Sequence, residues 1–258
     1  MKPANASRAV VVVVTHKSQP TPRERISFIR CVTVLSAHPI VLVCPEGLDI
    51  SVYRDLGGNA LRVCRVAQRD LASRQSYNRF KTLARFYSLF RSYEYLLTYE
   101  LDAYVFDDQL LYWCDQGYDY IGAPWFKRGK RGDGGRKFTR TLSSVGNSGF
   151  SLRNVQTCLR ILRERAKRPR GKIEHEDKFW CDVVPQNASS FNIAPVTEAL
   201  RFSFEVHPAH LFKLHGNRLP FGCHSWGRRG TRFWKRYIDF EDEDAARVLK
   251  VVNSRGSR

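Results

Sequence analysis

The chain has 258 residues, of which 43% are hydrophobic and 12% aromatic, and its formal net charge is +18. This length and apolar content are enough for one sizeable folded core, and they exclude a disordered or low-complexity chain. The positive charge indicates an anionic partner, and because no helix-turn-helix, zinc-finger or RNP pattern occurs, nucleic acid is the least favoured one.

The cysteines are scattered along the chain without a Cys-x-x-Cys pair, and their number is odd. They are Cys31, Cys44, Cys64, Cys114, Cys158, Cys181 and Cys223. Such a set is typical of free thiols in a reducing compartment and does not predict a zinc ion. The valine-rich run at residues 9–14 is too short for the core of a signal peptide, and no run of about 18 apolar residues occurs. We therefore expect a cytoplasmic protein without a membrane-spanning helix.

The N-terminal part of the chain alternates between strand-like and helix-like patterns. Residues 10–15, 39–44 and 61–66 are short and β-rich, whereas residues 23–35 and 73–93 are predicted helices. The second helix carries an aromatic stripe, and its Lys and Arg side chains are expected to be mostly solvated, with one or two reaching a substrate phosphate. Strands that alternate with helices predict an α/β sheet with parallel strands.

An apolar strand at residues 95–99 runs directly into Glu100-Leu101-Asp102. In an extended chain, side chains two residues apart point to the same side, so the Glu100 and Asp102 carboxylates should project together. Two hard oxygen ligands suit a divalent cation that completes its shell with phosphate oxygens. The alternative is that one carboxylate caps the following turn and the other is solvated.

The end of the first strand carries three polar residues, Thr15, His16 and Lys17. Ligands gather at the carboxyl ends of parallel strands, so we expect these residues to lie beside the two acids. Further along, Asp107 and Asp108 begin a helical or turn segment, where capping is their simplest role.

A basic, glycine-rich segment at residues 127–140 is predicted to be a mobile loop. It could serve as a solvated insertion, as a lid over an anionic ligand, or as a nucleic-acid arm. The string Gly146-Asn147-Ser148-Gly149 follows and leads into a predicted helix at residues 155–167. This string lacks the P-loop spacing, so its glycines indicate a close approach of the backbone to a substrate.

Two further polar strings complete the set of candidate functional residues. His175-Glu176-Asp177 opens an amphipathic segment, where both acids could simply complement the helix dipole. After a strand-like alternation at residues 201–205, a constrained turn at residues 219–226 contains His224 and Trp226.

Taken together, these strings resemble the GT-A class of nucleotide-sugar glycosyltransferases, most closely an uncharacterised bacterial branch found among polysaccharide-assembly genes. The resemblance covers residues 9–226 and rests on Tyr-Glu-Leu-Asp-Ala-Tyr-Val-Phe, Tyr-Ile-Gly-Ala-Pro-Trp and Leu-Pro-Phe-Gly-Cys-His-Ser-Trp, together with the Gly146 and His175 strings. It implies a GT-A (Rossmann-like) α/β fold, with a mixed, mainly parallel sheet flanked by helices in a single domain at residues 9–238. Residues 1–8 would then form a tail, and residues 239–258 an acidic segment with a frayed end.

The resemblance also implies roles for the candidate residues. Asp102 and His224 would hold Mn²⁺ or Mg²⁺, with Glu100 either a third ligand or a contact to the ribose or to a metal-bound water, since the class usually has Asp there. Asp177 and Glu176 would be the catalytic carboxylates, with Asp177 the base of an inverting reaction. The remaining assignments are the nucleotide contacts Thr15, His16, Lys17, Glu100 and Asp102, and the substrate contacts Trp125, Gly146, Asn147, Ser148, Gly149 and Trp226.

The function implied is transfer of a sugar from a nucleotide-diphosphate donor to a glycan or lipid-linked acceptor in surface polysaccharide assembly. The basic segments at residues 127–140 and 160–172 would hold the enzyme at the inner face of an anionic membrane. Two alternatives remain open: a nucleotidyltransferase on a similar sheet, and a non-catalytic basic protein that binds nucleic acid or another polyanion.

Overall fold

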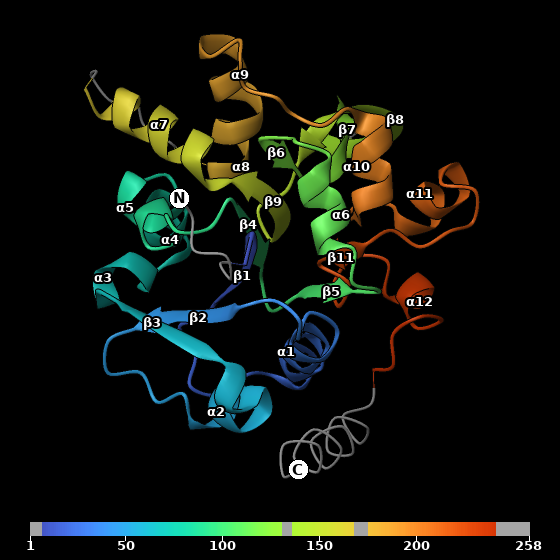
Figure 1. The fold of residues 1–258 in the computed structure, drawn as a ribbon. Helices are drawn as coiled ribbons and strands as arrows, with labels where there is room; N and C mark the ends of the chain where they lie inside the picture. The colour runs from blue at the N-terminus through green and yellow to red at the C-terminus, as the bar shows by residue number, and fades with distance from the viewer. Residues whose placement is uncertain (1–6, 131–135, 168–174, 241–258) are drawn as a thin grey trace.

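A central six-stranded sheet organises the computed structural model, which describes residues 7–130, 136–167 and 175–240 (Figure 1). Its strands, in spatial order, are β3 (Arg62–Val66), β2 (Ile40–Pro45), β1 (Ala9–Val14), β4 (Tyr95–Tyr99), β9 (Phe150–Asn154) and β6 (Tyr120–Ile121). The first four strands run parallel, and β9 is antiparallel to both β4 and β6. The fold is therefore the predicted single-domain α/β fold with a mixed, mainly parallel sheet.

The valine-rich strand β1 is apolar throughout because helices cover both faces of the sheet. Val11 and Val13 belong to a core shared with Phe28 of α1 (Pro22–Val34) and Tyr53 of α2 (Ser51–Gly57), whereas Val12 belongs to the opposite core. Figure 1 shows α1 and α2 on one side of the sheet and α3, α4, α5 and α7 on the other. Those helices are α3 (Gln68–Leu71), α4 (Arg74–Lys81), α5 (Ala84–Ser88) and α7 (Val155–Ala166).

The single helix predicted at residues 73–93 is wrong, because the structure has two short helices there, α4 and α5. Leu83, between them, has extended backbone angles (φ −111°, ψ 140°), and the Thr82 hydroxyl donates back to the Arg79 carbonyl at 2.8 Å. A side chain that satisfies a backbone carbonyl in this way competes with the helical pattern. The break lets buried aromatic residues of both helices, including Phe80 and Phe86, pack edge to face, with ring centroids 5.2 Å apart.

The basic segment predicted to be a loop is instead part of a β-hairpin wherever the structure describes it. Strands β7 (Ala123–Lys130) and β8 (Arg136–Gly146) pair antiparallel, with Arg128 opposite Phe138 and with register shifts near Phe126. Residues 131–135 lie outside the described part of the chain. Backbone pairing between the two arms overrides the loop-like composition, because each arm satisfies the polar backbone groups of the other.

The predicted strand at residues 201–205 is also wrong for its first half. Pro195 precedes α10 (Val196–Phe202), and only β10 (Ser203–Phe204) is extended. Ala199 and Phe202 are buried on one face of the helix, and Arg201 lies on the exposed face. A two-residue strand is too short for its alternation of inward and outward side chains to be distinguished from one turn of an amphipathic helix.

A second, three-stranded sheet carries one side of the candidate site. It has the order β10, β11 (Gly222–His224), β5 (Ala103–Val105), and β11 pairs antiparallel with β5, so that His224 lies opposite Ala103. Gly222 is required here, since a Cβ atom at this position would lie 2.3 Å from the Phe150 ring. This pairing brings a residue near the C-terminus beside the acids that follow β4. The remaining short helices are α6 (Leu110–Asp115), α8 (Glu176–Lys178), α9 (Val184–Asn187), α11 (Pro208–Leu214) and α12 (Thr231–Trp234).

All seven cysteines are free thiols, and five of them are buried. Burial raises the pKa of the Cys31 and Cys158 thiols above the ordinary range. Cys31 and Cys158 therefore behave as small apolar core residues. The structure agrees with the sequence prediction of unpaired cysteines.

Candidate active site

A cleft of about 520 Å³ opens where β1 and β4 end. The residues that follow β1 and those that follow β4 both line it, as expected for the carboxyl ends of parallel strands. The predicted site residues among them are Thr15, His16, Lys17, Glu100, Asp102 and Trp226. The fold thus gathers the predicted nucleotide contacts around one cavity.

The three residues after β1 differ in how available they are. Thr15 is buried, and its hydroxyl lies 2.9 Å from the Tyr53 hydroxyl. His16 is exposed, whereas Lys17 Nζ makes an ion pair with Glu24 at 2.7 Å. His16 and Lys17 therefore present groups to the cleft, and Thr15 holds the strand end in place.

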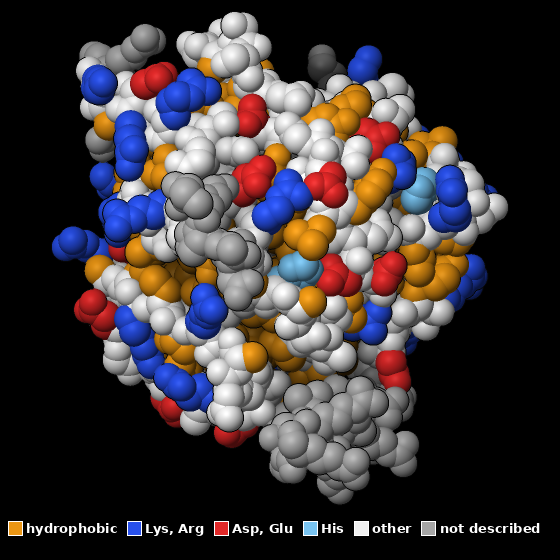
Figure 2. All heavy atoms as spheres, viewed as in Figure 1, with side chains coloured by type: hydrophobic (Ala, Val, Ile, Leu, Met, Phe, Trp, Pro, Cys, Tyr) orange, Lys and Arg blue, Asp and Glu red, His pale blue; other side chains and the backbone are white. Residues whose placement is uncertain are grey.

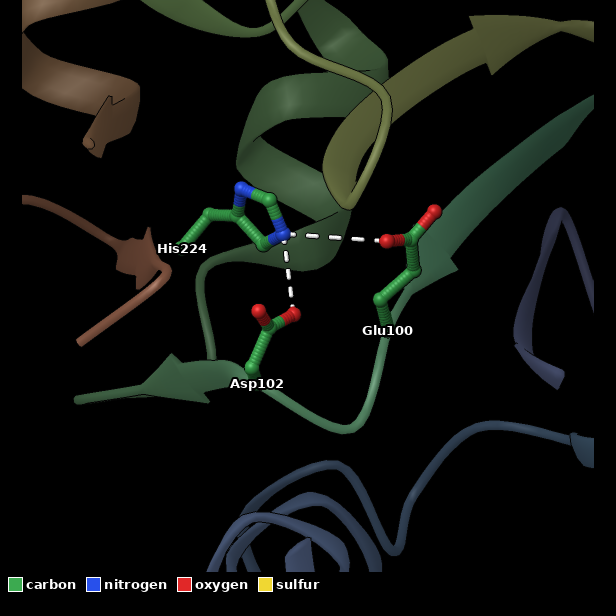
Figure 3. A group of neighbouring side chains, drawn as sticks. All are labelled: Glu100, Asp102 and His224. Carbon is green, nitrogen blue, oxygen red and sulfur yellow. Dashed lines mark ion pairs between the residues drawn. The ribbon is translucent and has the colours of Figure 1, made fainter. Parts of the chain in front are cut away.

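Glu100, Asp102 and His224 converge on one point (Figure 3). His224 Nε2 lies 2.9 Å from Asp102 Oδ1 and 3.7 Å from Glu100 Oε2, and one ligand atom from each residue falls within 4.8 Å of the other two. On its other side, His224 Nδ1 lies 3.5 Å from Glu205 Oε1, an outer contact that orients the ring. Two carboxylates and one imidazole fit a divalent cation, and the nitrogen ligand favours Mn²⁺ over Mg²⁺.

The two carboxylates and the burial of the His224 ring act on its pKa in opposite directions. Burial acts to lower the His224 pKa, but the Asp102 and Glu100 carboxylates raise it well above its ordinary value. Although Nε2 is buried and close to both acids, it makes no hydrogen bond of acceptable geometry. The imidazole nitrogen and the two carboxylates therefore face one another as the ligands of a cation would, and binding of a cation would be linked to loss of any proton on Nε2.

The two acids converge through a turn rather than through an extended strand. Residues 100–102 form a turn between β4 and β5, in which the Ala103 backbone N–H donates to the Glu100 carbonyl at 2.8 Å. Leu101 is buried at the centre of the turn. The prediction that Glu100 and Asp102 point together is correct, but the extended geometry from which it was derived is not.

The glycines of the 146–149 string allow side chains of the chain itself to come close. A Cβ atom on Gly149 would lie 2.2 Å from His224 Nε2, and one on Gly146 would lie 2.0 Å from the Trp125 ring. Asn147 has a left-handed backbone (φ 88°), and its side chain accepts a 2.7 Å hydrogen bond from the Gly149 N–H. The close approach predicted for a substrate is therefore made by His224 and Trp125.

Lys81 is a buried cation that joins the two halves of the site. Its Nζ lies 3.0 Å from Glu100 Oε1 and 3.7 Å from Glu176 Oε2, and it donates to the Ser148 hydroxyl. It also lies 4.1 Å from the centre of the Tyr77 ring. Lys81 thus connects the acid of the candidate metal site to helix α8.

Glu176 is engaged in the same buried network. It pairs with Arg153, and both side chains are fully inaccessible to solvent. Burial acts to raise the Glu176 pKa, but the charges of Arg153 and Lys81 hold it below its ordinary value. The Glu176 carboxylate is therefore balanced by two buried cations, and its catalytic role stays a prediction.

Asp177, the next residue, has a different environment. It is partly exposed, and its Oδ1 accepts a 2.8 Å hydrogen bond from the Lys178 backbone. Burial and the neighbouring Glu176 charge raise the Asp177 pKa above its ordinary value. A carboxylate that holds a proton more readily than usual is suited to accept one from a substrate.

The two tryptophans predicted to contact substrate are placed differently. Trp226 is fully buried, and its indole N–H donates to the Ala103 carbonyl at 3.0 Å, so the ring packs in the core and presents no free face. Trp125 is partly exposed on β7, against Gly146. Of the two, Trp125 alone keeps exposed surface for a ligand.

Sequence reasoning missed the role of Lys81, which was grouped with solvated basic residues. A signal was present: Lys81 lies four residues after Tyr77 and one after Phe80, on the face of the predicted aromatic stripe. It also missed Arg228, which lines the cleft and makes an ion pair with Asp102. No local pattern distinguishes Arg228 from the other arginines near it.

The fold is similar to that of solved GT-A glycosyltransferases. The galactosyltransferase LgtC, in complex with donor and acceptor sugar analogs, has a TM-score of 0.50 and 16% identity, over 94% of this chain and 95% of that chain. The bifunctional glycosyltransferase WbbM has a TM-score of 0.55 and 12% identity, over 96% of this chain and 50% of the WbbM chain. GlyE of Streptococcus pneumoniae has a TM-score of 0.53 and 12% identity, over 98% of this chain and 64% of the GlyE chain. The chain thus has a GT-A fold and spans only half of WbbM and less than two thirds of GlyE.

Residues 60–224 match the family described as a protein of unknown function, DUF5672, and the chain belongs to that family. The matched range contains the whole Glu100, Asp102 and His224 cluster, and also Lys81 and Asp177. No curated protein matches the chain.

The contact between Gly149 and His224 generates a first prediction. Gly149→Ala would push a methyl group into the imidazole, so the variant should bind Mn²⁺ at least about tenfold more weakly by calorimetry, because a ligand displaced by about an ångström no longer fits the coordination shell. Gly227→Ala is the matched control, since its Cβ would meet only the flexible Arg23 side chain in the same cleft. Equal Mn²⁺ affinity in the two variants would contradict the placement of the ion.

Proposed function

We propose that this protein is a metal-dependent glycosyltransferase that moves a sugar from a nucleotide-diphosphate donor to a hydroxyl of a glycan or lipid-linked acceptor. One observation carries the proposal: Glu100, Asp102 and His224 converge, and the two acids line a cleft at the strand ends of a GT-A fold. The same cleft offers His16 and Lys17 to an anionic ligand. A purely structural charged surface would not require an imidazole and two carboxylates to face one another.

The donor side rests on the carboxylates and the imidazole. Glu100 Oε1 is engaged by the Tyr77 hydroxyl at 3.1 Å and by Lys81 Nζ at 3.0 Å, which leaves Oε2 facing His224. Asp102 and His224 would hold Mn²⁺, with Glu100 Oε2 completing the protein ligands. A bound cation would stabilise the negative charge that develops on the leaving diphosphate.

The acceptor side rests on Asp177. A sugar hydroxyl is a weak nucleophile near neutral pH, so a positioned base must take its proton as the anomeric carbon is attacked. Asp177 is partly exposed and has a raised pKa, whereas its neighbour Glu176 is buried and paired with Arg153. A single displacement with Asp177 as base would invert the anomeric configuration, and Trp125 is the residue proposed to contact the acceptor.

Asp102→Ala tests the metal-dependent donor site. With Asp102 replaced, binding of UDP, GDP and dTDP should no longer depend on Mn²⁺, since the main hard ligand between protein and diphosphate is gone. Calorimetry with Mn²⁺ and with chelator measures this, and Asp55→Ala, an exposed acid on α2, is the control. Product analysis separates the enzyme classes: a glycosyltransferase releases nucleoside diphosphate from a nucleotide sugar, whereas a nucleotidyltransferase releases pyrophosphate from a nucleoside triphosphate. Nucleotide binding that is equal with metal or chelator in the wild type would refute the metal assignment.

Asp177→Asn tests the base. It should keep donor binding and lose roughly 10²- to 10⁴-fold in transfer rate, and the wild-type rate should rise with pH through a pKa above the ordinary Asp value. Because the folded-state pKa is raised, the carboxylate contributes stability at low pH that is lost as pH rises, so the substitution should not destabilise the fold at pH 7. If the acid only complemented the helix dipole, the variant would lose about 0.3 to 1 kcal/mol of unfolding free energy and turn over normally. Asp182→Asn, an exposed acid in the same segment, is the control.

The acceptor proposed for surface polysaccharide assembly would be presented at the inner face of a membrane, and basic side chains on one side of the molecule favour that location. Figure 2 shows Lys and Arg along the side formed by α3, α4, α5 and α7. Arg160, Arg163 and Lys167 are exposed on α7, whose Gln156 donates to the Arg91 carbonyl at 2.9 Å. Among the described residues, no helix is long and apolar enough to cross a bilayer. We propose peripheral contact through charge.

Liposome sedimentation measures this contact. The triple variant Arg160→Gln, Arg163→Gln, Lys167→Gln should pellet less with anionic vesicles than the wild type, because each basic side chain near the surface contributes about 1 kcal/mol. The control is a second triple variant, which removes three positive charges from another part of the surface: Lys213→Gln, Arg232→Gln, Arg236→Gln. Pelleting should fall at high salt. Equal pelleting with neutral vesicles would refute the proposal.

A further inference from the structure

Arg228 reaches into the candidate metal site from the solvent side. Its Nη2 makes an ion pair with Asp102 Oδ2, while Asp102 Oδ1 faces His224 at 2.9 Å. The Arg228 side chain is 75% exposed, compared with 26% for Asp102. One oxygen of the central carboxylate therefore faces the largely buried His224 ring, and the other is held by the charged side chain of Arg228 on the solvent side.

The backbone beneath Arg228 is held by hydrogen bonds, although its side chain is largely exposed. The N–H groups of Arg228 and Arg229 donate to the Ser225 carbonyl at 3.0 and 2.7 Å, and Ser225 has a left-handed backbone (φ 58°). The Gly227 carbonyl accepts a 2.6 Å hydrogen bond from Arg23. A long exposed side chain on such a turn can change its contact without moving the main chain, and exposed ion pairs are individually weak.

The two ligands proposed for the cleft have opposite effects on the Arg228 guanidinium: a divalent cation repels it, and a nucleoside diphosphate attracts it. A divalent cation at Asp102 competes with Arg228 for the same carboxylate and repels it. A nucleoside diphosphate brings at least two negative charges into the cleft that Arg228 lines, and its paired oxygens match the fork of an arginine.

We propose that Arg228 is an exchangeable counter-ion: it holds Asp102 while no divalent cation is bound, and it moves to the donor diphosphate once the cation has replaced it. Arg228 thereby weakens binding of the cation alone and strengthens binding of the nucleotide to the cation-loaded protein. This inference rests on the proposed function, since it requires the metal site at Asp102. It makes the cation and the nucleotide bind as a pair.

The test is calorimetry on the intact chain with two probes. For Arg228→Gln, Mn²⁺ alone should bind about threefold more tightly, the size expected when an exposed ion pair is removed. With Mn²⁺ saturating, the tightest of UDP, GDP and dTDP should bind about tenfold more weakly, the size expected when a charged hydrogen bond is lost. Arg232→Gln, an exposed arginine on α12, is the matched control and should leave both affinities unchanged. Melting temperatures of the ion-free proteins confirm that both variants are folded.

Arg228→Gln is expected to raise the affinity for Mn²⁺ and to lower the affinity for the nucleotide. These opposite changes distinguish an exchangeable counter-ion from other roles of Arg228. If Mn²⁺ affinity is unchanged or falls in Arg228→Gln, the guanidinium does not compete for Asp102 and the counter-ion exchange is overturned, while the metal site stands. If nucleotide affinity is unchanged, Arg228 does not reach the diphosphate and the exchange is likewise overturned. If the wild type binds no Mn²⁺, the proposed function and this inference both fail. Arg228→Lys keeps the charge without the fork, so it should match the wild type for Mn²⁺ and fall between wild type and Arg228→Gln for the nucleotide.

Discussion

A network of four alternating charges, three of them buried, supports the whole candidate site. Lys81 and Arg153 supply the positive charges, and Glu100 and Glu176 the negative ones. Removing one member of such a network leaves an uncompensated buried charge, which costs about 3 to 5 kcal/mol. Because Glu100 belongs to the candidate metal cluster and Glu176 precedes Asp177, the network sets the position of the proposed donor side relative to the proposed acceptor side. The rest of the geometry depends on this constraint.

Close packing of glycines against rings completes the arrangement. Gly149 leaves room for His224, and Gly222 leaves room for Phe150, so the second sheet can approach the end of β4. The β11–β5 pairing then places His224 opposite Ala103, next to Asp102. The imidazole and the two acids meet because two backbones pair closely, and a single added methyl group at Gly149 would separate them.

The basic residues fall into groups with different physical roles, although composition counts them alike. Lys81 and Arg153 are buried and balance carboxylates in the core. Arg228 is exposed but paired with Asp102, which makes it available for exchange with other ions. The exposed residues of α7, such as Arg163, face solvent and would respond to an anionic surface. A net charge of +18 predicts anionic partners in general but does not say which arginine meets which anion.

The sequence by itself determined the strand–helix alternation and the apolar strand β1, because these follow from local periodicity and side-chain type. It also predicted that Glu100 and Asp102 project together, but in the structure they do so through a turn that the period of a strand does not describe. Only the tertiary structure decided that the helix at residues 73–93 breaks near Thr82, that the basic segment forms a hairpin, and that Lys81 is buried. The family resemblance named His224, and the structure decided how it reaches the two acids, since that contact depends on pairing between segments far apart in the chain. Local sequence patterns do not predict such pairing, because the free energy that stabilises it comes from packing and charge balance between residues far apart in the chain.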